Sequence, residues 1–347
     1  MPAIPPKRIE DFRKKDDLLI VTGAGGFIAG SLVRYFHDKG FTHIRAVDKK
    51  PLGEWYRRTP GVEDLVLDVS VPDNCARACE GAVEVYNLAA DMGGMGFIER
   101  YRIECLRSVL INTHMIEAAQ RAGADRYFFS SSACAYNIDL QQDVQSRALK
   151  ESDAYPANAE RGYGWEKLFS EIVCQEYWAE RGLKTAIARF HNVYGPHGTW
   201  DGGREKAPAA LSRKVVEARA NGSYAVELWG DGTRTRSFMW IGDCVEGIDM
   251  IMHCDELVAT PINLGSHELV SINELLTLIE DVAGFKVERR YDLTQPLGVG
   301  GRNSDNTMIR SVLGWEPSTP LRDGMAKTYA WIEEQYNLRK SGRKVVL

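Results

Sequence analysis

The stretch LLIVTGAGGFIA, residues 18–29, decides the fold of this chain. Its apolar start, Leu18–Thr22, predicts a buried strand, and the residues after the glycine turn predict a helix of several turns. Gly23 permits the tight turn, Gly26 keeps the path of a pyrophosphate free of a side chain, and Ala29 lets the helix pack close to the strand. The N-terminus of such a helix presents free N–H groups and a favourable dipole to an anion. The stretch therefore predicts a dinucleotide-binding turn.

Outward from this stretch, strand-like apolar runs alternate with helical patterns through the first half of the chain. Such alternation predicts an α/β fold with a parallel, doubly wound (Rossmann) sheet. The predicted strands cover residues 18–22, 44–48, 65–67, 83–88, 127–131 and 184–190. One predicted helix follows the glycine turn and ends near residue 39, and two others cover 105–121 and 163–180.

The rhythm changes after Tyr194, where loops rich in glycine, arginine and proline separate shorter elements. We therefore expect a dinucleotide-binding domain over residues 1–194 and a smaller C-terminal α/β lobe for the substrate over 195–347. A return of the chain to the first domain over about 236–265 is left open. The strand-like runs that suggest this return cover 238–243 and 261–264.

The totals fit a globular chain of two joined lobes, with 347 residues, 44% hydrophobic and 26% charged, and a net charge of −5. This balance argues against nucleic acid as a partner. No run approaches the roughly 20 apolar residues of a membrane helix. Since Met1–Asp17 is charged and has no apolar signal core, we expect a cytoplasmic protein without a membrane partner. The scattered cysteines predict free thiols and no metal site.

Residues at the ends of the next strands support a cofactor site. Asp48 ends the second predicted strand, 25 residues after Gly23, where a carboxylate can bind both ribose hydroxyls. An acid there repels a 2′-phosphate and favours NAD over NADP, although Lys49 and Lys50 leave the alternative open. A glycine turn beside unrelated acids is the other explanation, and the combined context favours the cofactor. The predicted NAD contacts are Gly23, Gly26, Phe27, Ile28, Asp48, Asp68, Ala89, Tyr163 and Lys167.

A serine-rich strand end precedes a helix that opens with Tyr163-x-x-x-Lys167. One helical turn places both side chains on the same face, and an ammonium near a phenol lowers a pKa that starts at about 10. Ser132 can hydrogen-bond the reacting hydroxyl while Tyr163 removes its proton and hydride passes to NAD. The same spacing also arises where a tyrosine packs on a lysine stem, but the preceding glycine turn favours catalysis. The sequence thus predicts an NAD-dependent redox step.

Together these motifs resemble the extended short-chain dehydrogenase/reductase family of nucleotide-sugar enzymes, over nearly the whole chain. Dehydratases of this family carry Thr-Asp-Glu where this chain has Ser132-Ala133-Cys134. Because Ala133 cannot protonate a leaving group, the sequence argues against dehydration. Cys134 is instead similar to the proton-transfer cysteine of members that invert C3 and C5 of GDP-mannose. A thiol suits this role because its pKa of about 8.5 can fall near a cation.

A charged run in a glycine-rich loop, Gly202–Pro208, carries the second group that the resemblance implies. Lys206 is the expected partner of Cys134, because inversion needs one group to take a proton from one face of the sugar and another to return it to the opposite face. A lysine can serve if burial or a neighbouring cation lowers its pKa from about 10.4. The resemblance implies Cys134 as base and Lys206 as acid, and the residues themselves leave the direction open.

The resemblance implies further contacts to a GDP-sugar. Gly93 would let the hexose approach closely, Asn192 would bind the sugar or the diphosphate, and Arg302 would hold sugar hydroxyls. Lys214, Thr235 and Arg236 would bind the diphosphate. Lys214 can equally be a solvated helix residue, and the arginines can be structural ion pairs. The expected substrate contacts are Gly93, Ser132, Ala133, Cys134, Asn192, Glu205, Lys206, Ala207, Lys214, Thr235, Arg236 and Arg302.

The chain departs from the family pattern at two places. Arg161-Gly162 stands where Asp-Ala is usual before Tyr163, which affects the fine positioning of the substrate rather than the chemistry. The last residues, 339–347, form a basic tail in which Arg343 replaces a small polar residue. Whether this tail adds a phosphate contact or stays away from the site is left open.

The expected activity is that of an isomerase that leaves NAD unchanged overall. Tyr163 and NAD oxidise the sugar at C4, Cys134 and Lys206 exchange the protons at C3 and C5, and hydride then returns to C4. GDP-mannose would give GDP-L-galactose and, by inversion at C5 alone, GDP-L-gulose. A nucleotide-sugar 4-epimerase is the first alternative, and a non-catalytic NAD-sensing protein, against which the intact catalytic motif argues, is the second. The family also implies a homodimer through helices 105–121 and 163–180.

Overall fold

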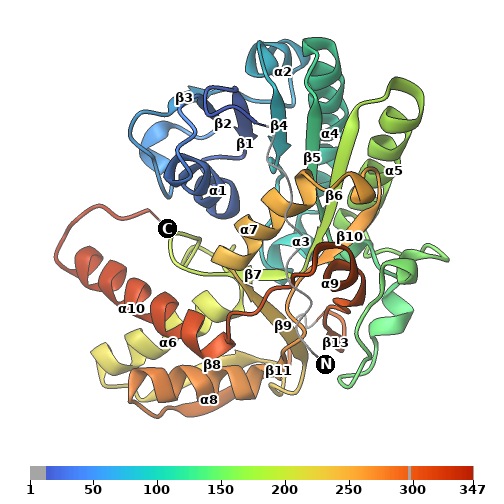
Figure 1. Cartoon of the computed structure of the whole chain (residues 1–347). Helices are drawn as coiled ribbons and strands as arrows, with labels where there is room; N and C mark the ends of the chain where they lie inside the picture. The colour runs from blue at the N-terminus through green and yellow to red at the C-terminus, as the bar shows by residue number, and fades with distance from the viewer. Residues whose placement is uncertain (1–12, 296–297, 347) are drawn as a thin grey trace.

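The computed structural model describes residues 13–295 and 298–346, and a parallel sheet forms its centre (Figure 1). Residues 1–12, part of the segment expected to be charged and without a signal core, lie outside the described residues. Over the described residues this sheet has seven strands, which confirms the predicted doubly wound fold. From edge to edge the strands are β10 (Pro261–Leu264), β6 (Lys184–Phe190), β5 (Arg126–Ser132), β4 (Glu84–Asn87), β1 (Leu19–Thr22), β2 (Ile44–Asp48) and β3 (Glu63–Val66).

The strand order reverses between β1 and β4, and this reversal positions the site. The chain adds β2 and β3 on one side of β1, and then β4, β5, β6 and β10 on the other. The register sets Thr22 beside Asn87, and Asn87 beside Phe129, so the carboxyl ends of three strands meet at one edge. In doubly wound sheets ligands bind outside this edge, where the order reverses.

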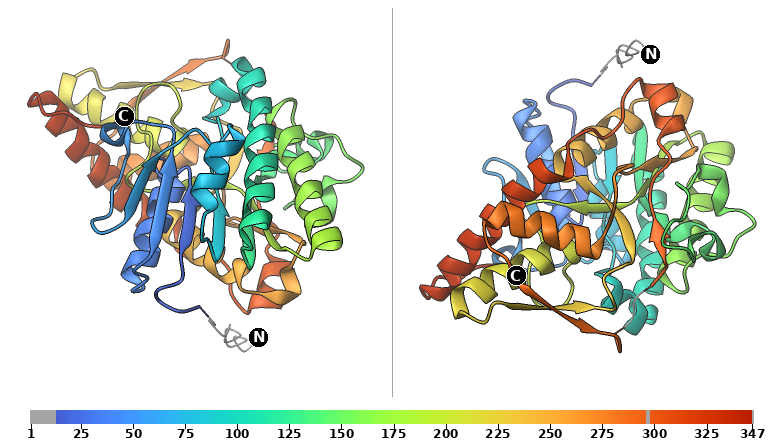
Figure 2. Two further views of the ribbon diagram at one scale, coloured as in Figure 1. Left: turned by 90° about the horizontal axis from the view of Figure 1, so that it is seen from above. Right: turned by 90° about the horizontal axis from the view of Figure 1, so that it is seen from below.

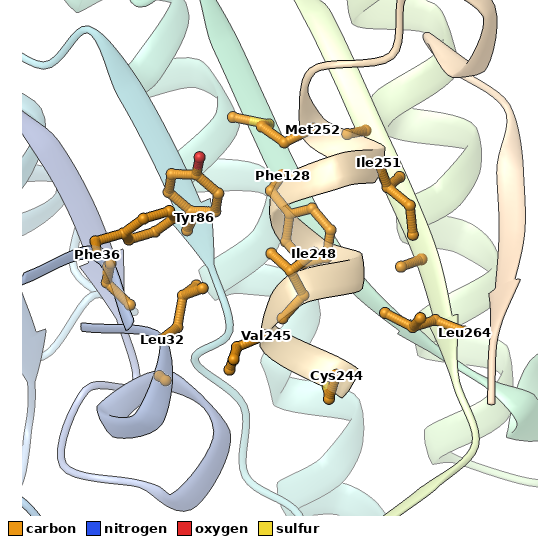
Figure 3. Close-up of a cluster of buried hydrophobic side chains, with 14 of the residues drawn as sticks. Leu32, Phe36, Tyr86, Phe128, Cys244, Val245, Ile248, Ile251, Met252 and Leu264 are labelled. Atoms are coloured by element: carbon orange, nitrogen blue, oxygen red, sulfur yellow. The ribbon is translucent and has the colours of Figure 1, made fainter. Parts of the chain in front are cut away.

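Helices cover both faces of the sheet because each turns an apolar stripe toward it. On one face α7 (Ile241–Met252) buries Val245, Ile248 and Met252, and Figure 3 shows these side chains between Leu32 and Phe36 on one side and Leu264 on the other. Burying each such side chain contributes roughly 1.5–3 kcal/mol. One face carries α1 (Phe27–Asp38) and α7 (Ile241–Met252), and the other carries α2 (Pro72–Cys79), α4 (Arg102–Ala122) and α5 (Tyr163–Arg181).

Two predicted strands differ from the structure. The third strand covers Glu63–Val66 instead of 65–67. The strand predicted over 238–243 is wrong in its second half, since the strand β9 (Thr235–Trp240) ends at Trp240 and α7 begins at Ile241. The apolar residues after Trp240 recur at helical spacing and bury against the sheet, and this packing outweighs the strand-like composition of the short run.

A second lobe packs against the carboxyl edge of the sheet, as Figure 2 shows. Its strand β9 pairs with β7, β11 and β13, β8 pairs with β12, and three helices bury a core of their own. Its strands are β7 (Asn192–Tyr194), β8 (Ala225–Trp229), β9 (Thr235–Trp240), β11 (Leu269–Ser271), β12 (Glu288–Asp292) and β13 (Gly301–Arg302), and its helices are α6 (Ala207–Asn221), α8 (Ile272–Ala283) and α10 (Leu321–Lys340).

The chain crosses between the two cores more than once. After β9 it returns through α7 and β10, and later through α9, whose Ile309 and Leu313 join the core of the first sheet. The division at residue 194 stays a prediction. The remaining elements are α3 (Met95–Arg100), α9 (Thr307–Leu313) and the short helical turns η1 (Leu52–Glu54), η2 (Ala133–Ala135), η3 (Ile138–Gln141), η4 (Glu151–Ala154) and η5 (Asp255–Leu257). Within the described part of the chain no helix combines the length and apolar character that crossing a membrane requires.

Candidate active site

The carboxyl ends of the central strands open into a cleft of about 760 Å³. It lies at the reversal of strand order, and the second lobe forms its other wall. The predicted residues that line it are Gly23, Gly26, Phe27, Ile28, Asp48, Asp68, Ala89, Gly93, Ser132, Tyr163, Lys167, Glu205 and Lys206. The predicted residues outside this lining are Ala133, Cys134, Asn192, Ala207, Lys214, Thr235, Arg236 and Arg302.

The glycine turn fits the pyrophosphate of a dinucleotide. Gly23 has a φ of +75°, and a Cβ there would lie 2.9 Å from the carbonyl oxygen of Leu88. This conformation and this close approach both require glycine. Gly26 caps α1 without any side-chain hydrogen bond, and the first residues of the helix line the cleft. The N–H groups of that first turn are therefore available to an anion.

Asp48 lies at the wall where an adenosine ribose would bind. Its Oδ2 accepts a hydrogen bond from the Gly25 N–H at 3.0 Å and its Oδ1 one from the Lys50 N–H at 2.9 Å, which hold the carboxylate in place. Lys49 pairs with Asp91 at 2.8 Å, and the Lys50 ammonium lies over the Tyr56 ring, 4.7 Å from its centroid. Because both lysines have partners of their own, the carboxylate dominates this end of the cleft, as an NAD site requires.

Tyr163, Lys167 and Ser132 meet in the middle of the cleft. Tyr163 is 6% exposed and Lys167 1%, and the Lys167 Nζ lies 5.5 Å from the centroid of the Tyr163 ring. The lowering of the Tyr163 pKa that the sequence led us to expect from Lys167 stays a prediction. Burial raises the pKa of Tyr163 well above its ordinary value, the nearby Cys134 and Glu166 add to this, and a hydrogen bond with Ser132 opposes it.

A buried polar network, which no motif predicted, supports Lys167. Its Nζ lies 3.8 Å from Glu166 Oε2, and the other oxygen of Glu166 accepts a hydrogen bond from Asn112 of α4. Asn112 in turn accepts a hydrogen bond from Asn87 at 3.0 Å, at the end of β4. The network thus ties the start of α5 to the sheet. The acid directly before Lys167 is the one signal in the sequence that could have indicated it.

Cys134 lies on the turn η2 directly after β5 and is 6% exposed. Arg302 of β13 donates from Nη1 to the Cys134 Sγ at 3.2 Å, from Nη2 to Glu160 Oε2 at 3.2 Å, and from Nε to the buried Gln141. Burial raises the pKa of the Cys134 thiol, Glu160 raises it further, and the Arg302 guanidinium opposes both. Sequence reasoning missed Glu160 and Gln141, since neither belongs to a recognisable motif.

Lys206 precedes α6 and lines the cleft. Burial lowers its pKa, and the neighbouring Cys134 works in the opposite direction. The Arg302 guanidinium, close enough to act on both groups, lowers the pKa of Lys206 further. The structure therefore brings together the two groups predicted to exchange protons, although 72 positions separate Cys134 and Lys206 in the chain.

The residues predicted for the diphosphate form hydrogen bonds to backbone carbonyl groups. Lys214 donates to the Glu227 carbonyl at 2.7 Å, and Asn192 donates to that of Ser237 at 3.2 Å. Thr235 likewise donates to the carbonyl of Val144, and Arg236 to that of Val299. Ala133 shares the turn η2 with Cys134, and Ala207 begins α6.

Arg236 adds positive charge close to Cys134. Burial and the neighbouring Arg302 guanidinium lower the pKa of Arg236 to about 10, while Glu160 opposes the shift. Two buried guanidinium groups in proximity favour an anion beside them.

The C-terminal tail reaches the cleft. After α10 ends at Lys340, residues 344–346 line the cleft, and Trp200 Nε1 donates to the carbonyl of Val346 at 3.0 Å. Arg343, whose role the sequence left open, is exposed and lies outside the lining of this cleft. The tail therefore closes one side of the cleft through Lys344 and the two valines.

Known proteins resemble this chain in sequence and in fold. It is 41% identical over 340 residues to the GDP-mannose 3,5-epimerase of Arabidopsis thaliana, covering 96% of this chain and 86% of that protein. It is 41% identical to the GDP-mannose 3,5-epimerase 1 of Oryza sativa subsp. japonica, covering 92% and 83%. The crystal structure of a UDP-glucose 4-epimerase from Thermotoga maritima, 21% identical, matches with a TM-score of 0.82 over 92% of this chain and 99% of that one.

A family profile gives the most general assignment. The profile described as the NAD dependent epimerase/dehydratase family matches residues 19–265, which run from the first strand of the sheet to just past β10. This range contains the glycine turn, the Tyr163-x-x-x-Lys167 pair and Cys134 with Lys206. The chain belongs to the NAD dependent epimerase/dehydratase family.

Proposed function

We propose that this chain is an NAD-dependent GDP-mannose 3,5-epimerase, an isomerase that converts GDP-mannose to GDP-L-galactose and GDP-L-gulose. The observation that carries the proposal is the gathering of Cys134 and Lys206 beside Tyr163 at the end of β5. A 4-epimerase needs Tyr163 but has no use for two further proton-transfer groups. The similarity to GDP-mannose 3,5-epimerases over nearly the whole chain supports the same choice.

Each residue has a distinct part in the proposed reaction. When bound, NAD accepts hydride from C4 of the sugar and later returns it, and its cationic ring favours the phenolate of Tyr163. Tyr163 takes the proton of the C4 hydroxyl, and Ser132 orients that hydroxyl. The resulting ketone acidifies the hydrogens on C3 and C5. Cys134 removes a proton from one face, and Lys206 returns one to the other.

Charge and burial favour these roles. Burial lowers the pKa of Lys206, so that it can give up a proton more easily than an exposed lysine. Arg302 donates to the Cys134 sulfur and would stabilise a thiolate there. Burial and the Arg302 guanidinium lower the pKa of Arg236 to about 10. The negative charge of a substrate diphosphate would stabilise the charged form of this guanidinium. Lys214, Thr235 and Asn192 would have to exchange their backbone partners for the nucleotide sugar.

Incubation with GDP-mannose in deuterium oxide tests the proposal, with NMR of the recovered sugar. We expect deuterium at C5 and C3 with the wild-type protein and at neither carbon with Cys134→Ala. Cys174→Ala, which removes a buried thiol about three turns farther along α5 than Tyr163, is the matched control and should keep the label. Inversion at C4 without deuterium at C3 or C5 would instead establish a 4-epimerase. An unchanged, unlabelled nucleotide sugar with the wild-type protein would contradict the proposal.

We further propose that the chain forms a homodimer through α4 and α5. These helices lie side by side in Figure 1 and expose large apolar residues to solvent. Such a contiguous apolar face favours association with a second copy. The exposed residues are Ile103, Leu106, Leu110, Trp165, Phe169 and Ile172. Analytical ultracentrifugation should give a molecular mass twice that of one chain, and the Phe169→Glu variant should have the mass of a single chain. The cytoplasmic location expected from the sequence stays a prediction.

A further inference from the structure

Glu160 lies beside Cys134 and has no part in the reaction described above. Its backbone N–H donates to the carbonyl of Cys134 at 3.0 Å, so the main chain holds the two residues together. Arg302 then contacts both side chains, with Nη1 on the Cys134 sulfur and Nη2 on a Glu160 oxygen, each at 3.2 Å. One guanidinium group therefore bridges a thiol and a carboxylate.

The Glu160 carboxylate also lies close enough to Cys134 to raise the pKa of its thiol. Cys134 and Arg302 are 6% and 7% exposed, so charges interact more strongly here than in water. The Glu160 side chain is 15% exposed, which gives this carboxylate access to solvent. The three groups have no net charge when the thiol is protonated. They keep that neutrality if the thiol proton moves to the carboxylate.

We propose that Glu160 accepts the proton of the Cys134 thiol and thereby generates the thiolate that acts on the sugar. This inference rests on the proposed epimerase function. The S–H bond breaks, an O–H bond forms on the Glu160 carboxylate, and Arg302 stays bound to both. The thiolate then takes the sugar proton and becomes a thiol again, while Lys206 protonates the opposite face. The proton on Glu160 passes to solvent as Lys206 takes one up, so the cycle returns all three groups to their starting states.

A purely structural role for Glu160 is the competing explanation. In that case its carboxylate would only anchor Arg302, and its loss would lower activity equally at every pH. If Glu160 instead accepts the thiol proton, the Cys134 thiol and the Glu160 carboxylate share one proton. The thiolate can then form without releasing that proton to solvent. Glu160 acts through Cys134 and is in this sense a positioning residue, so its test has to report the ionisation of the thiol.

The first arm of the test needs no substrate. Thiolate absorbs in the ultraviolet, and the absorbance of Cys134 is obtained over a pH series by subtracting the Cys134→Ala protein from the parent. The same subtraction is made in the Glu160→Gln background, where the amide still accepts a hydrogen bond from Arg302. Removing the negative charge should lower the pH at which the Cys134 thiolate forms by about one unit, or roughly tenfold in thiolate at a fixed pH.

The second arm measures deuterium entry at C5 of GDP-mannose between about pH 5.5 and pH 9, a range that spans ordinary thiol titration. In the wild-type protein the rate should stay nearly level toward low pH, because the carboxylate remains ready to take the thiol proton. In Glu160→Gln the rate should fall about tenfold for each pH unit below the thiol pKa. Glu160→Asp keeps a carboxylate and should restore most of the wild-type profile. Glu288→Gln, an exposed acid of the second lobe, is the matched control.

The outcomes separate the two explanations. A new loss of exchange at low pH in Glu160→Gln, together with its recovery in Glu160→Asp, supports the proton transfer to Glu160, whereas the lower midpoint follows from the lost charge under either explanation. If either the midpoint or the shape of the exchange profile is unchanged in Glu160→Gln, the inference is overturned. A wild-type protein that exchanges no deuterium at any pH contradicts the proposed function, and the thiolate titration still decides whether Glu160 controls Cys134.

Discussion

The two walls of the cleft are built in different ways. On the cofactor wall, Gly23, Asp48 and Ala89 each end or follow a strand of one sheet, and adjacent strands hold them in register. Beside the substrate wall, Arg302 contacts Cys134 across 168 positions of the chain and Glu160 across 142. The first wall therefore depends on strand order, and the second depends on how the second lobe docks against the sheet.

This difference separates binding from chemistry. A change on the cofactor wall should alter NAD binding through local contacts, whereas a change around Cys134 should alter proton transfer and leave NAD affinity intact. Tyr163 lies where the two walls meet, since it packs against Cys134 and shares a helix with Lys167. The predictions below test this separation, beginning with the residue on which both walls depend.

Replacing Tyr163 should have the largest effect. Tyr163→Phe keeps the ring and its packing but removes the group that takes the C4 proton, so turnover of GDP-mannose should fall by about 10³-fold. NMR of the nucleotide sugar measures turnover. The control is the Kd for NAD, measured by calorimetric titration, which should change less than about threefold. Turnover close to that of the wild-type protein would remove Tyr163 from the proposed reaction.

Replacing Lys206 should affect proton transfer on the substrate wall and leave the redox step intact. Lys206→Gln removes the proposed proton donor, so deuterium entry at C5 should fall by about 10²-fold while oxidation at C4 continues. Borodeuteride, added during turnover, traps the 4-keto sugar and reports that oxidation. Lys286→Gln removes an exposed lysine of the second lobe and should leave both readings unchanged. Loss of the trapped ketone together with the exchange would show that Lys206 acts on both walls.

Replacing Asp48 should affect the other wall. Asp48→Asn weakens the charge-assisted hydrogen bonds expected to the adenosine ribose, and the Kd for NAD should rise by about tenfold. The asparagine no longer repels a 2′-phosphate, so the preference for NAD over NADP should narrow as well. Calorimetric titration with both cofactors measures this. An unchanged ratio of the two affinities would place the ribose elsewhere.

The smallest effect on turnover is expected at the amino end of the strands, where His253 lies 2.7 Å from Glu84 and 3.3 Å from Asp249. Although burial opposes its charge, hydrogen bonds to both acids raise the pKa of His253 to about 9 from an ordinary 6.5. This stabilisation is therefore complete below pH 6.5 and is lost as the pH rises through about 9.

The wild-type protein should accordingly lose about 3 kcal/mol of stability over that interval, or a few degrees in Tm. His253→Gln should remove most of this pH dependence and leave the pH profile of epimerisation unchanged. Thermal unfolding at a series of pH values measures this pH dependence of stability in both proteins. An equal decline in the variant would assign the pH dependence to other groups.

The same contrast explains how far sequence reasoning reached. Five of the six strands predicted over the first half lie within one residue of the observed ones at each end, because a buried strand needs a continuous apolar run that is visible locally. The run 238–243 misled the prediction because six residues do not distinguish a buried strand from the start of a buried helix. Only the core around Val245 and Ile248 shows that α7 continues the pattern.

The candidate site divides in the same way. Tyr163 and Lys167 were predicted because they open a helix in a recognisable pattern, and Cys134 was predicted from the family resemblance. Glu160 and Gln141 were missed because their importance comes from Arg302, which reaches them from a strand of only two residues. The raised pKa of Tyr163 was also missed, since burial depends on the whole surrounding structure.

The sequence by itself determined the parallel sheet, the glycine turn and the order in which the cofactor residues appear, because these follow from apolar spacing and backbone conformation over a few residues. The tertiary structure decided which charges surround Cys134, that residues 344–346 reach the cleft, and that α7 and β10 return to the first sheet. These features arise from contacts between segments that lie far apart in the chain, and only the packing of the folded chain brings them together.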